Sequence, residues 1–413
     1  MSVSTPTSGR AGQVTGLARL IRTGRDDFAR DHWGRGPLLS TADQLGGGGF
    51  DGLLDEDAVD ELLTTRGLRT PFVRVAKAGR TLPERSFTGP AGVGASITDQ
   101  VRDDELARLF ADGHTIVMQA LHRTWEPVMR LVQELSDDLA HPVQANAYIT
   151  PPQSTGFSAH YDVHDVFVLQ ISGEKRWRIH APVLVDPLRT EPWDQRGDAV
   201  AEQATGEPAL EATMRPGDVL YLPRGWLHSA TALGGTSTHL TLGVHTWQGG
   251  HVLDALVDHA RRAVADDPRV RASLPLGVDL GDPHALSGTL DHVRDALVRA
   301  VQEVPDDVLA QSLLGRSHGS RRAAPVAPLR TARDLAALEQ DPTGWVLRRR
   351  DHLGAVLDGG VLRSRAGTVT VAADDSACVT RLLDEGVVPV GDLGVDLARR
   401  LVLAGLATPD RAA

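Results

Sequence analysis

The sequence predicts a mainly β core with helical segments before and after it. Between residues 143 and 247, short apolar or alternating stretches are separated by Gly, Pro and Asp, which is the pattern of short strands joined by turns. On both sides of this region, apolar residues recur at the spacing of amphipathic helices. A run of short strands of this kind indicates a β-sandwich or barrel of the jelly-roll or cupin type.

The region before the β core alternates helices and strands, so we expect N-terminal α/β elements. Residues 1–16 are polar, lack the apolar segment of a signal peptide, and are expected to form a disordered tail. Acidic residues at a helix start and glycine at its end support boundaries such as 55–67. The predicted helices are 17–33, 55–67, 103–113 and 126–140, and the predicted strands are 37–40, 71–79 and 114–121.

The β core itself consists of short predicted strands with one long interruption. We expect the polar, irregular excursion 183–213 to form a lid or loop over a site. The predicted strands are 143–151, 165–173, 175–181, 218–223, 226–233 and 237–247.

Beyond residue 250 the helical pattern returns. Residues 251–314 are predicted to be helical, and these helices either pack against a second copy of the chain or cover the barrel. Residues 315–330, rich in Gly, Pro and Arg, are a candidate linker. Residues 331–413 alternate short helices and strands, which is typical of a small winged-helix-like domain. The core domain then spans 17–250.

Charge and cysteine content limit the classes of protein to be considered. The formal net charge of -11 disfavours a nucleic-acid or anionic-membrane binder and permits a basic protein partner. Cys378 has no second cysteine to pair with, which excludes an internal disulfide and fits a reducing compartment. No stretch approaches the roughly 20 apolar residues of a membrane span. We therefore expect a cytoplasmic protein.

Two histidines and one aspartate form a candidate metal site. In a strand, residues i and i+2 project to the same face, so His160 and Asp162 in HYDVHDVF are expected to point together. His228 ends the stretch RPGDVLYLPRGWLH, whose last strand can pair near the first in a rolled barrel. Two imidazoles and one carboxylate form a facial triad, which leaves coordination positions open and suits non-haem Fe(II).

Other assignments of these histidines stay open. A lone H-x-D is common by chance, and zinc is the alternative metal, although closed structural zinc sites use four protein ligands, preferably with cysteine. His164 shares the predicted face but lies about 13 Å from His160 at ~3.3 Å per residue, so we expect it to face ligands or substrate without binding the metal. His239 and His245 are expected inside the barrel or at its surface.

Lys175 is a candidate partner for a bound acid. Among 43 Lys plus Arg, only Lys77 and Lys175 are lysines. A facial-triad iron needs electrons to activate dioxygen, commonly from a 2-oxoacid such as 2-oxoglutarate, whose far carboxylate needs a cation. Lys175 follows an SGE turn and opens the strand beside the triad, so we expect it to hold that carboxylate. The alternative is that EKRWR is a solvated strand face, with Arg176 pointing to the opposite side.

Three stretches of the sequence resemble a known family. NAYITPPQSTGFSAHYDVHDVFVLQISGEKRWRIHAP, PGDVLYLPRGWLHSA and STHLTLGVHT closely resemble the JmjC-type ribosomal oxygenases of the cupin-like superfamily. The resemblance is strong over roughly residues 26–250 and weak in the C-terminal third. It implies a double-stranded β-helix, Fe(II), 2-oxoglutarate, a helical dimerisation region and a winged-helix-like C-terminal domain. It also implies hydroxylation of a ribosomal protein, on an arginine in bacteria or a histidine in eukaryotes.

Carried over by position, the resemblance implies a role for individual residues. The metal ligands match His160, Asp162 and His228, and the lysine that binds the far carboxylate of 2-oxoglutarate matches Lys175. These four residues are the ones that the spacing and the lysine count had already singled out.

The resemblance also points to residues that line the cosubstrate pocket. Asn146 and Tyr148, in NAY, match such positions, although Tyr148 is alternatively a packed barrel aromatic. Where relatives place a serine or similar hydroxyl, this chain has Gly243. Thr241, on the same face, is expected to substitute in part.

The sequence leaves several functions open. The first is an oxygenase that hydroxylates a basic ribosomal protein and forms a homodimer. The second is an oxygenase of another peptide or a small metabolite, because function resides in the site and not in the fold. A histone-type demethylase is disfavoured by the composition. A non-catalytic cupin module that binds a ligand is the alternative of a different class.

Overall fold

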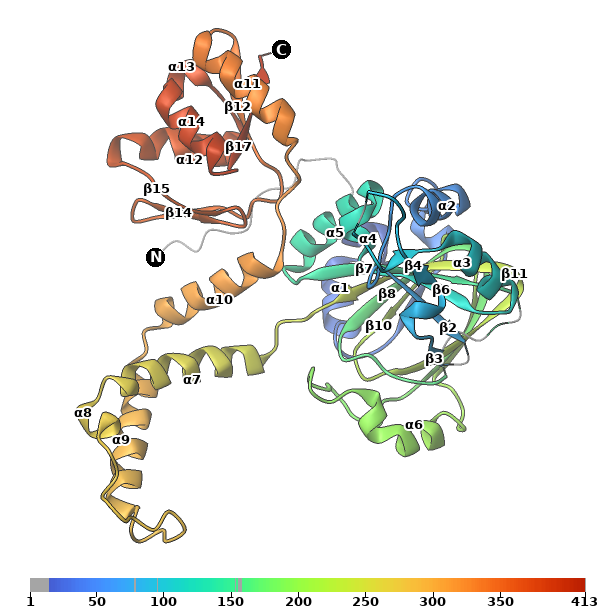
Figure 1. Cartoon of the computed structure of the whole chain (residues 1–413), viewed down its shortest axis with the longest axis horizontal. Coiled ribbons are helices and arrows are strands. Elements are labelled where there is room, and N and C mark those ends of the chain that lie inside the picture. The colour runs from blue at the N-terminus through green and yellow to red at the C-terminus, as the bar shows by residue number, and fades with distance from the viewer. Residues whose placement is uncertain (1–14, 78, 95, 153, 155–157, 413) are drawn as a thin grey trace. The chain divides into compact units, whose positions relative to one another are not determined.

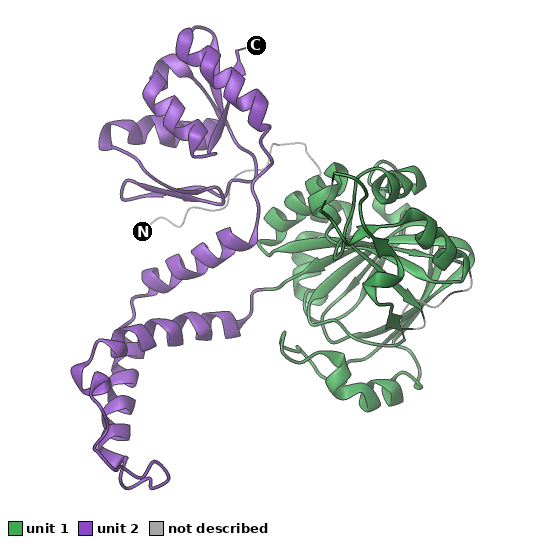
Figure 2. Cartoon of the chain, in the orientation of Figure 1, with its two compact units in different colours: residues 1–246 green, residues 247–413 purple. Residues whose placement is uncertain are grey.

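The computed structural model describes residues 15–412 apart from 78, 95, 153 and 155–157. The chain forms two compact units, residues 1–246 and 247–413 (Figure 2). The predicted disordered tail, 1–16, lies outside the described residues except for its last two. Among the described residues, no helix is both long and apolar enough to cross a membrane.

Unit 1 is built on one nine-stranded sheet (Figure 1). The main path of the sheet runs β1-β10-β8-β11-β7-β6-β2-β3, and β9 pairs with β8. These strands are β1 Leu38–Ser40, β10 Val219–Leu222, β8 Asp165–His180, β11 Leu227–Val244, β7 Val143–Thr150, β6 Thr115–Met118, β2 Val73–Lys77, β3 Arg80–Thr81 and β9 Leu210–Met214. The predicted mainly β core is confirmed.

Two long strands, β8 and β11, hold this sheet together. They pair antiparallel along most of their length, with shifts of register between Leu233 and His239. The first half of β8 also pairs with β10, and its second half with β9. We predicted four separate strands here, and that prediction is wrong. Gly173 has a φ of 64°, so the chain bulges where we expected a turn and then stays in the ladder.

Side-chain alternation separates the hydrophobic core from the site. On β7, Ala145 and Ala147 are buried in the core, while Asn146 and Tyr148 project from the opposite face. On β11, Leu240 and Leu242 belong to the core cluster in the same way. Because strand residues alternate between faces, one face of each strand stabilises the fold and the other lines the cavities.

Short helices and small strands cover the core of unit 1. On α5, Val128, Leu131 and Leu135 are buried, as the spacing of an amphipathic helix requires. The predicted helix 17–33 is interrupted, because Gly24 is extended and caps a second, separate helix. These elements are η1 Leu17–Arg19, α1 Arg25–Asp31, η2 Asp43–Leu45, α2 Glu56–Thr64, η3 Glu84–Ser86, β4 Thr88–Gly89, β5 Gln100–Val101, α3 Asp103–Ala111, α4 Leu121–Thr124 and α5 Glu126–Leu139.

The excursion 183–213 contains regular structure that we did not predict. It includes η4 Trp193–Arg196, α6 Gly197–Gln203 and most of β9. Val200 of α6 is buried against Tyr161 and Leu227, so the excursion packs on the site region through its own small apolar cluster.

Unit 2 begins with helices and continues into a small α/β region with its own apolar core. Helix α10 extends into the predicted linker 315–330, and only residues 321–327 lie between α10 and α11. The winged-helix-like character of 331–413 stays a prediction. The elements are α7 Gly249–Ala265, α8 Pro268–Arg271, α9 Ser287–Glu303, α10 Asp306–Ser320, α11 Pro328–Gln340, β12 Trp345–Arg349, β13 Val356–Asp358, β14 Val361–Ser364, β15 Gly367–Thr370, η5 Ala373–Asp375, α12 Ser376–Glu385, β16 Val387–Pro389, α13 Val390–Leu393, α14 Val395–Leu403 and β17 Ala407–Arg411.

The bulge in β8 leads to a prediction about stability. A Cβ at Gly173 would lie 2.1 Å from the backbone oxygen of Thr236, and the φ of 64° disfavours any other residue. We expect Gly173→Ala to lower the free energy of unfolding by about 2 kcal/mol or more, as measured by urea denaturation. The control is Gly235→Ala in β11, where a Cβ meets nothing within 4 Å. Equal stability of the two variants would contradict the prediction.

Candidate metal centre

The site is assembled by backbone hydrogen bonds between two distant segments. His160 and His228 form an isolated antiparallel bridge, in which each amide donates to the other's carbonyl, at 3.2 and 2.8 Å. The amide of Gly225 donates to the carbonyl of Asp162 at 3.0 Å. We predicted a strand through 160–164, but outside this bridge the chain there is irregular. The same side chains meet because the corner 223–228 docks onto the segment 160–165.

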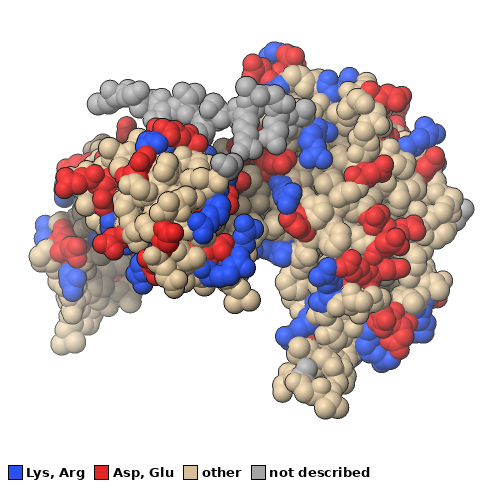
Figure 3. Space-filling model, turned by 90° about the horizontal axis from the view of Figure 1, so that it is seen from above, with Lys and Arg blue, Asp and Glu red and all other residues tan. Residues whose placement is uncertain are grey.

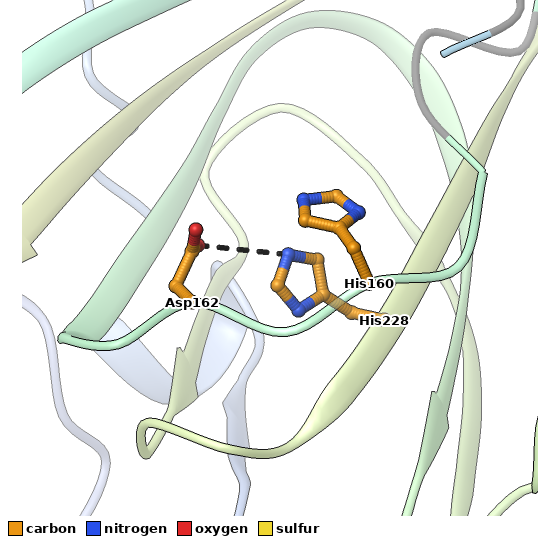
Figure 4. Close-up of side chains that lie close together, drawn as sticks. All are labelled: His160, Asp162 and His228. Carbon is orange, nitrogen blue, oxygen red and sulfur yellow. Dashed lines mark ion pairs between the residues drawn. The ribbon is translucent and has the colours of Figure 1, made fainter. Parts of the chain in front are cut away.

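The three predicted ligands converge on one point (Figure 4). One ligand atom from each of His160, Asp162 and His228 lies within 4.8 Å of the others. His228 Nε2 is 3.7 Å from Asp162 Oδ2, and the ring centroids of the two histidines are 4.4 Å apart. Three donors at these separations can surround a single ion and leave its remaining coordination positions open.

The hydrogen bonds of the two imidazoles involve Nδ1 and leave Nε2 of each ring available to bind a metal. Nδ1 of His160 lies 2.8 Å from the carbonyl of Ser158, and Nδ1 of His228 lies 3.1 Å from that of Trp226. Because a carbonyl only accepts, each Nδ1 carries the proton and each Nε2 keeps its lone pair. Orientation of the ring by a carbonyl through the second nitrogen is typical of metal-binding histidines.

The ionisation of the three groups also suits a divalent ion. Burial, with a further contribution from His160, lowers the pKa of His228 to about 4, so its imidazole is neutral. Burial acts to raise the pKa of Asp162, but His164, His228 and His160 together lower it, and the carboxylate stays ionised. A donor set of two imidazoles and one carboxylate fits Fe(II). This donor set lacks the four ligands of a closed structural zinc site.

A cavity of about 200 Å³ joins the triad to Lys175. Tyr148 and Thr241, which we expected near the cosubstrate, also line this cavity. Burial, followed by the charge of Asp162, raises the pKa of Tyr148 to about 12, so its hydroxyl remains a hydrogen-bond donor. The cavity therefore contains the candidate metal ligands at one position and a buried cation at another.

Lys175 is a buried lysine whose amine contacts a hydroxyl and an imidazole. The residue is 3% exposed. Its Nζ donates to Thr150 Oγ1 at 3.0 Å and lies 3.4 Å from His239 Nδ1. Among the described residues, no carboxylate forms an ion pair with it. Burial alone lowers its pKa to about 7. An anion bound here would restore the charge, so the site fits the far carboxylate of a small diacid.

Lys175 reaches the cavity for a reason that we did not predict. Val166 and Val168, at even positions of β8, line the same cavity as Lys175 and Trp177, at odd positions. Side chains at even positions face the cavity before the bulge at Gly173, and side chains at odd positions face it after the bulge. Both halves of the strand therefore contribute side chains to the cavity. Arg176 is exposed, as expected.

A second cavity, of about 400 Å³, lies beside the first. Asp162, Tyr148 and Thr241 line both cavities, while Asn146 and His164 line only the second. Asn146, which we expected near the cosubstrate, therefore lies apart from Lys175. Its Oδ1 accepts from the amide of Ala120 at 3.0 Å, which leaves its NH₂ group for other contacts.

Sequence reasoning missed several residues of the site. Thr115, Thr150 and Arg74 line the first cavity. Because residues of β7 alternate between its faces, Thr150 could have been predicted on the same face as Tyr148. Arg74 lies between two buried valines of β2, Val73 and Val75. His239, which we expected inside the barrel or at its surface, is buried and stacks on Tyr148 with ring centroids 4.9 Å apart.

Comparisons with known proteins agree with this geometry. Residues 120–252 match the family described as "JmjC domain". The protein "Ribosomal oxygenase 1" of Gallus gallus is 32% identical over 304 residues, which are 68% of this chain and 45% of the chicken protein. "Bifunctional lysine-specific demethylase and histidyl-hydroxylase NO66" of Drosophila persimilis is 29% identical over 61% of this chain and 35% of the fly protein. In both, the match spans less than half of the relative's own length.

Solved structures with the same fold include the Escherichia coli ribosomal oxygenase YcfD. Its crystal structure superposes with a TM-score of 0.56 at 18% identity and covers 95% of this chain and 99% of YcfD. A structure of YcfD in complex with cobalt and 2-oxoglutarate superposes equally well, at 17% identity. This likeness supports the cupin-like fold of the β core. Residues 120–252 are thus similar to JmjC domains, and the predicted resemblance to the ribosomal oxygenases is confirmed.

Proposed function

We propose that this chain is an Fe(II)- and 2-oxoglutarate-dependent oxygenase that hydroxylates an arginine or histidine side chain of a ribosomal protein. The observation that carries the proposal is the coexistence, in one cavity, of a His-Asp-His group within 4.8 Å and a buried lysine without a carboxylate partner among the described residues. A module that bound only a metal would not need the lysine.

Four residues of the first cavity have roles in this proposal. His160, Asp162 and His228 would hold the ion through Nε2 and carboxylate atoms, and Lys175 would anchor the far carboxylate of 2-oxoglutarate. Together with dioxygen, the bound iron and 2-oxoglutarate supply the oxidising power that hydroxylates an unactivated C–H bond. The chain contributes the orientation of these groups and the cavity that contains them.

The second cavity is the place for the substrate side chain. Because the diacid would occupy the space next to Lys175, the substrate must reach the metal from another direction. The second cavity shares Asp162 with the first and is lined by hydrogen-bonding groups such as Asn146 and Arg74. It therefore suits a polar side chain that enters from outside the barrel.

Charge and family support a ribosomal protein as partner. The net charge of -11 complements a basic protein, although acidic and basic side chains are interspersed on the face shown in Figure 3. Relatives are named ribosomal oxygenases. The cytoplasmic location and the absence of direct nucleic-acid binding, both expected from composition, stay predictions.

The function is tested by following cosubstrate and product together. With Fe(II), 2-oxoglutarate and native ribosomal proteins, we expect succinate release and a mass increase of one oxygen atom on a ribosomal protein, measured by intact mass spectrometry. Asp162→Ala and His228→Ala should abolish both signals, because each removes a metal ligand. The control His284→Ala alters an exposed histidine of unit 2 and should change neither.

The possible failures of this experiment have different meanings. Succinate release without an oxygen gain on any ribosomal protein would contradict the substrate assignment and favour another peptide or a metabolite. An absence of succinate from the wild-type protein would contradict the oxygenase assignment and favour a module that only binds ligands.

The low pKa of Lys175 predicts how the affinity for 2-oxoglutarate depends on pH. Burial lowers this pKa to about 7, so above that pH the lysine is neutral until a carboxylate binds and a proton is taken up. We expect the Kd for 2-oxoglutarate to rise by up to about tenfold per pH unit between pH 7 and 9. The Kd is measured by calorimetry with Mn²⁺ in place of iron. Lys175→Ala should bind weakly, with a flat profile. An unchanged pH slope in this variant would refute the assignment.

We also propose that the chain forms a homodimer through its helical region. Large apolar side chains are exposed on α7, where Leu253 is 59% and Val257 45% exposed, and they lie four residues apart on one helix face. The double variant Leu253→Asp, Val257→Asp should convert a dimer to a monomer in sedimentation velocity. Leu329→Asp, at an exposed position of α11, is the control and should leave the dimer intact. A dimer that persisted in the double variant would refute this interface.

A further inference from the structure

One wall of the second cavity is formed by an imidazole that is not one of the three candidate metal ligands. His164 lines this cavity together with Asp162, which it follows by two residues. It does not belong to the set of residues whose ligand atoms converge on the metal position. Its ring therefore faces the space assigned to the substrate while remaining close to the reaction centre.

A glycine on β11 creates the room for this imidazole. Gly243 pairs with Gln144 of β7 and Val166 of β8, so it lies in the middle of the sheet. A Cβ at position 243 would lie 2.6 Å from Nε2 and 2.7 Å from Cδ2 of His164. Real Cβ atoms do not approach other atoms so closely. Any side chain at 243 would therefore displace the His164 ring, and the contribution of this glycine is space and not an unusual φ.

Neighbouring groups hold the His164 ring in this position. The ring of His245 stacks on it, with centroids 5.0 Å apart and an interplanar angle of 29°. Nε2 of His164 lies 3.4 Å from Nε2 of Gln144, a residue that also lines the cavity. Nδ1 is buried without a hydrogen-bond partner among the described residues. Packing against Gly243 and His245, more than hydrogen bonding, therefore sets the orientation of the ring.

We propose that His164, admitted by Gly243, is a specificity-determining residue for the substrate side chain. The flat ring limits the depth of the cavity and presents a planar surface, which fits a planar side chain such as a guanidinium or an imidazole. This inference rests on the proposed function, because it assumes that the second cavity receives the substrate. It assigns no part in metal or 2-oxoglutarate binding to His164.

Two single variants and their combination test the proposal. His164→Val removes the ring, and Gly243→Ser displaces it without changing residue 164. With native ribosomal proteins as substrate, we expect each to lower kcat/KM for product formation by at least about tenfold, mainly through KM. Substrate-independent conversion of 2-oxoglutarate to succinate should fall clearly less than product formation, because neither variant removes a candidate metal ligand or Lys175. His284→Val is the matched control.

The double variant separates a role in specificity from damage to the fold. Once His164→Val has emptied the space, the added side chain of Gly243→Ser meets no ring, so the two losses should be clearly less than additive. His164→Phe keeps a planar ring and should recover much of the activity lost in His164→Val.

Specific results would overturn the proposal. Hydroxylation by His164→Val with wild-type kcat and KM would show that the ring does not contact the substrate. An equal fall of succinate production in His164→Val would place the residue at the metal and not at the substrate. Failure of the underlying oxygenase assignment looks different, because the wild-type protein would then release no succinate.

Discussion

The site depends on a backbone pairing between two segments that are far apart in the sequence. His160 and His228 exchange amide hydrogen bonds, and Gly225 donates to the carbonyl of Asp162. These bonds set the separation of the ligand atoms before any metal is present. Position 225 in this corner favours glycine, since it has a φ of 86° and a Cβ there would lie 2.6 Å from the backbone oxygen of Leu184. The buried carboxylate of Asp165 reinforces the docking by accepting from the amide of Arg224 at 3.1 Å.

The sheet then distributes stability and chemistry between its two faces. Alternate residues of β7 and β11 pack in the core, and those between them line two adjoining cavities. The bulge at Gly173 shifts the alternation of β8 by one position, so that Lys175 enters the cavity that contains the triad. Lys175 therefore lines the first cavity, and the ring of His164, for which Gly243 leaves room, lines the second.

Much of this site could be predicted, although partly for reasons that the structure corrects. His160, Asp162 and His228 were identified from their spacing, but they meet through an isolated bridge and not along a predicted strand. Lys175 was identified as the buried cation, but a bulge and not a turn directs it inward. Residues such as Arg74 were missed, because a single charged residue in a strand does not show which cavity its side chain will reach.

The sequence by itself determined the mainly β core, the residue types of the metal group and the relationship to the ribosomal oxygenases, because local alternation, turn residues and motif spacing are properties of short segments. Only the tertiary structure decided that β8 and β11 are continuous strands, that Asn146 and Lys175 belong to different cavities, and that Gly243 makes room for His164. These features depend on contacts between residues distant in the sequence. Their geometry follows from the pairing and bulging of whole strands, which no local pattern encodes.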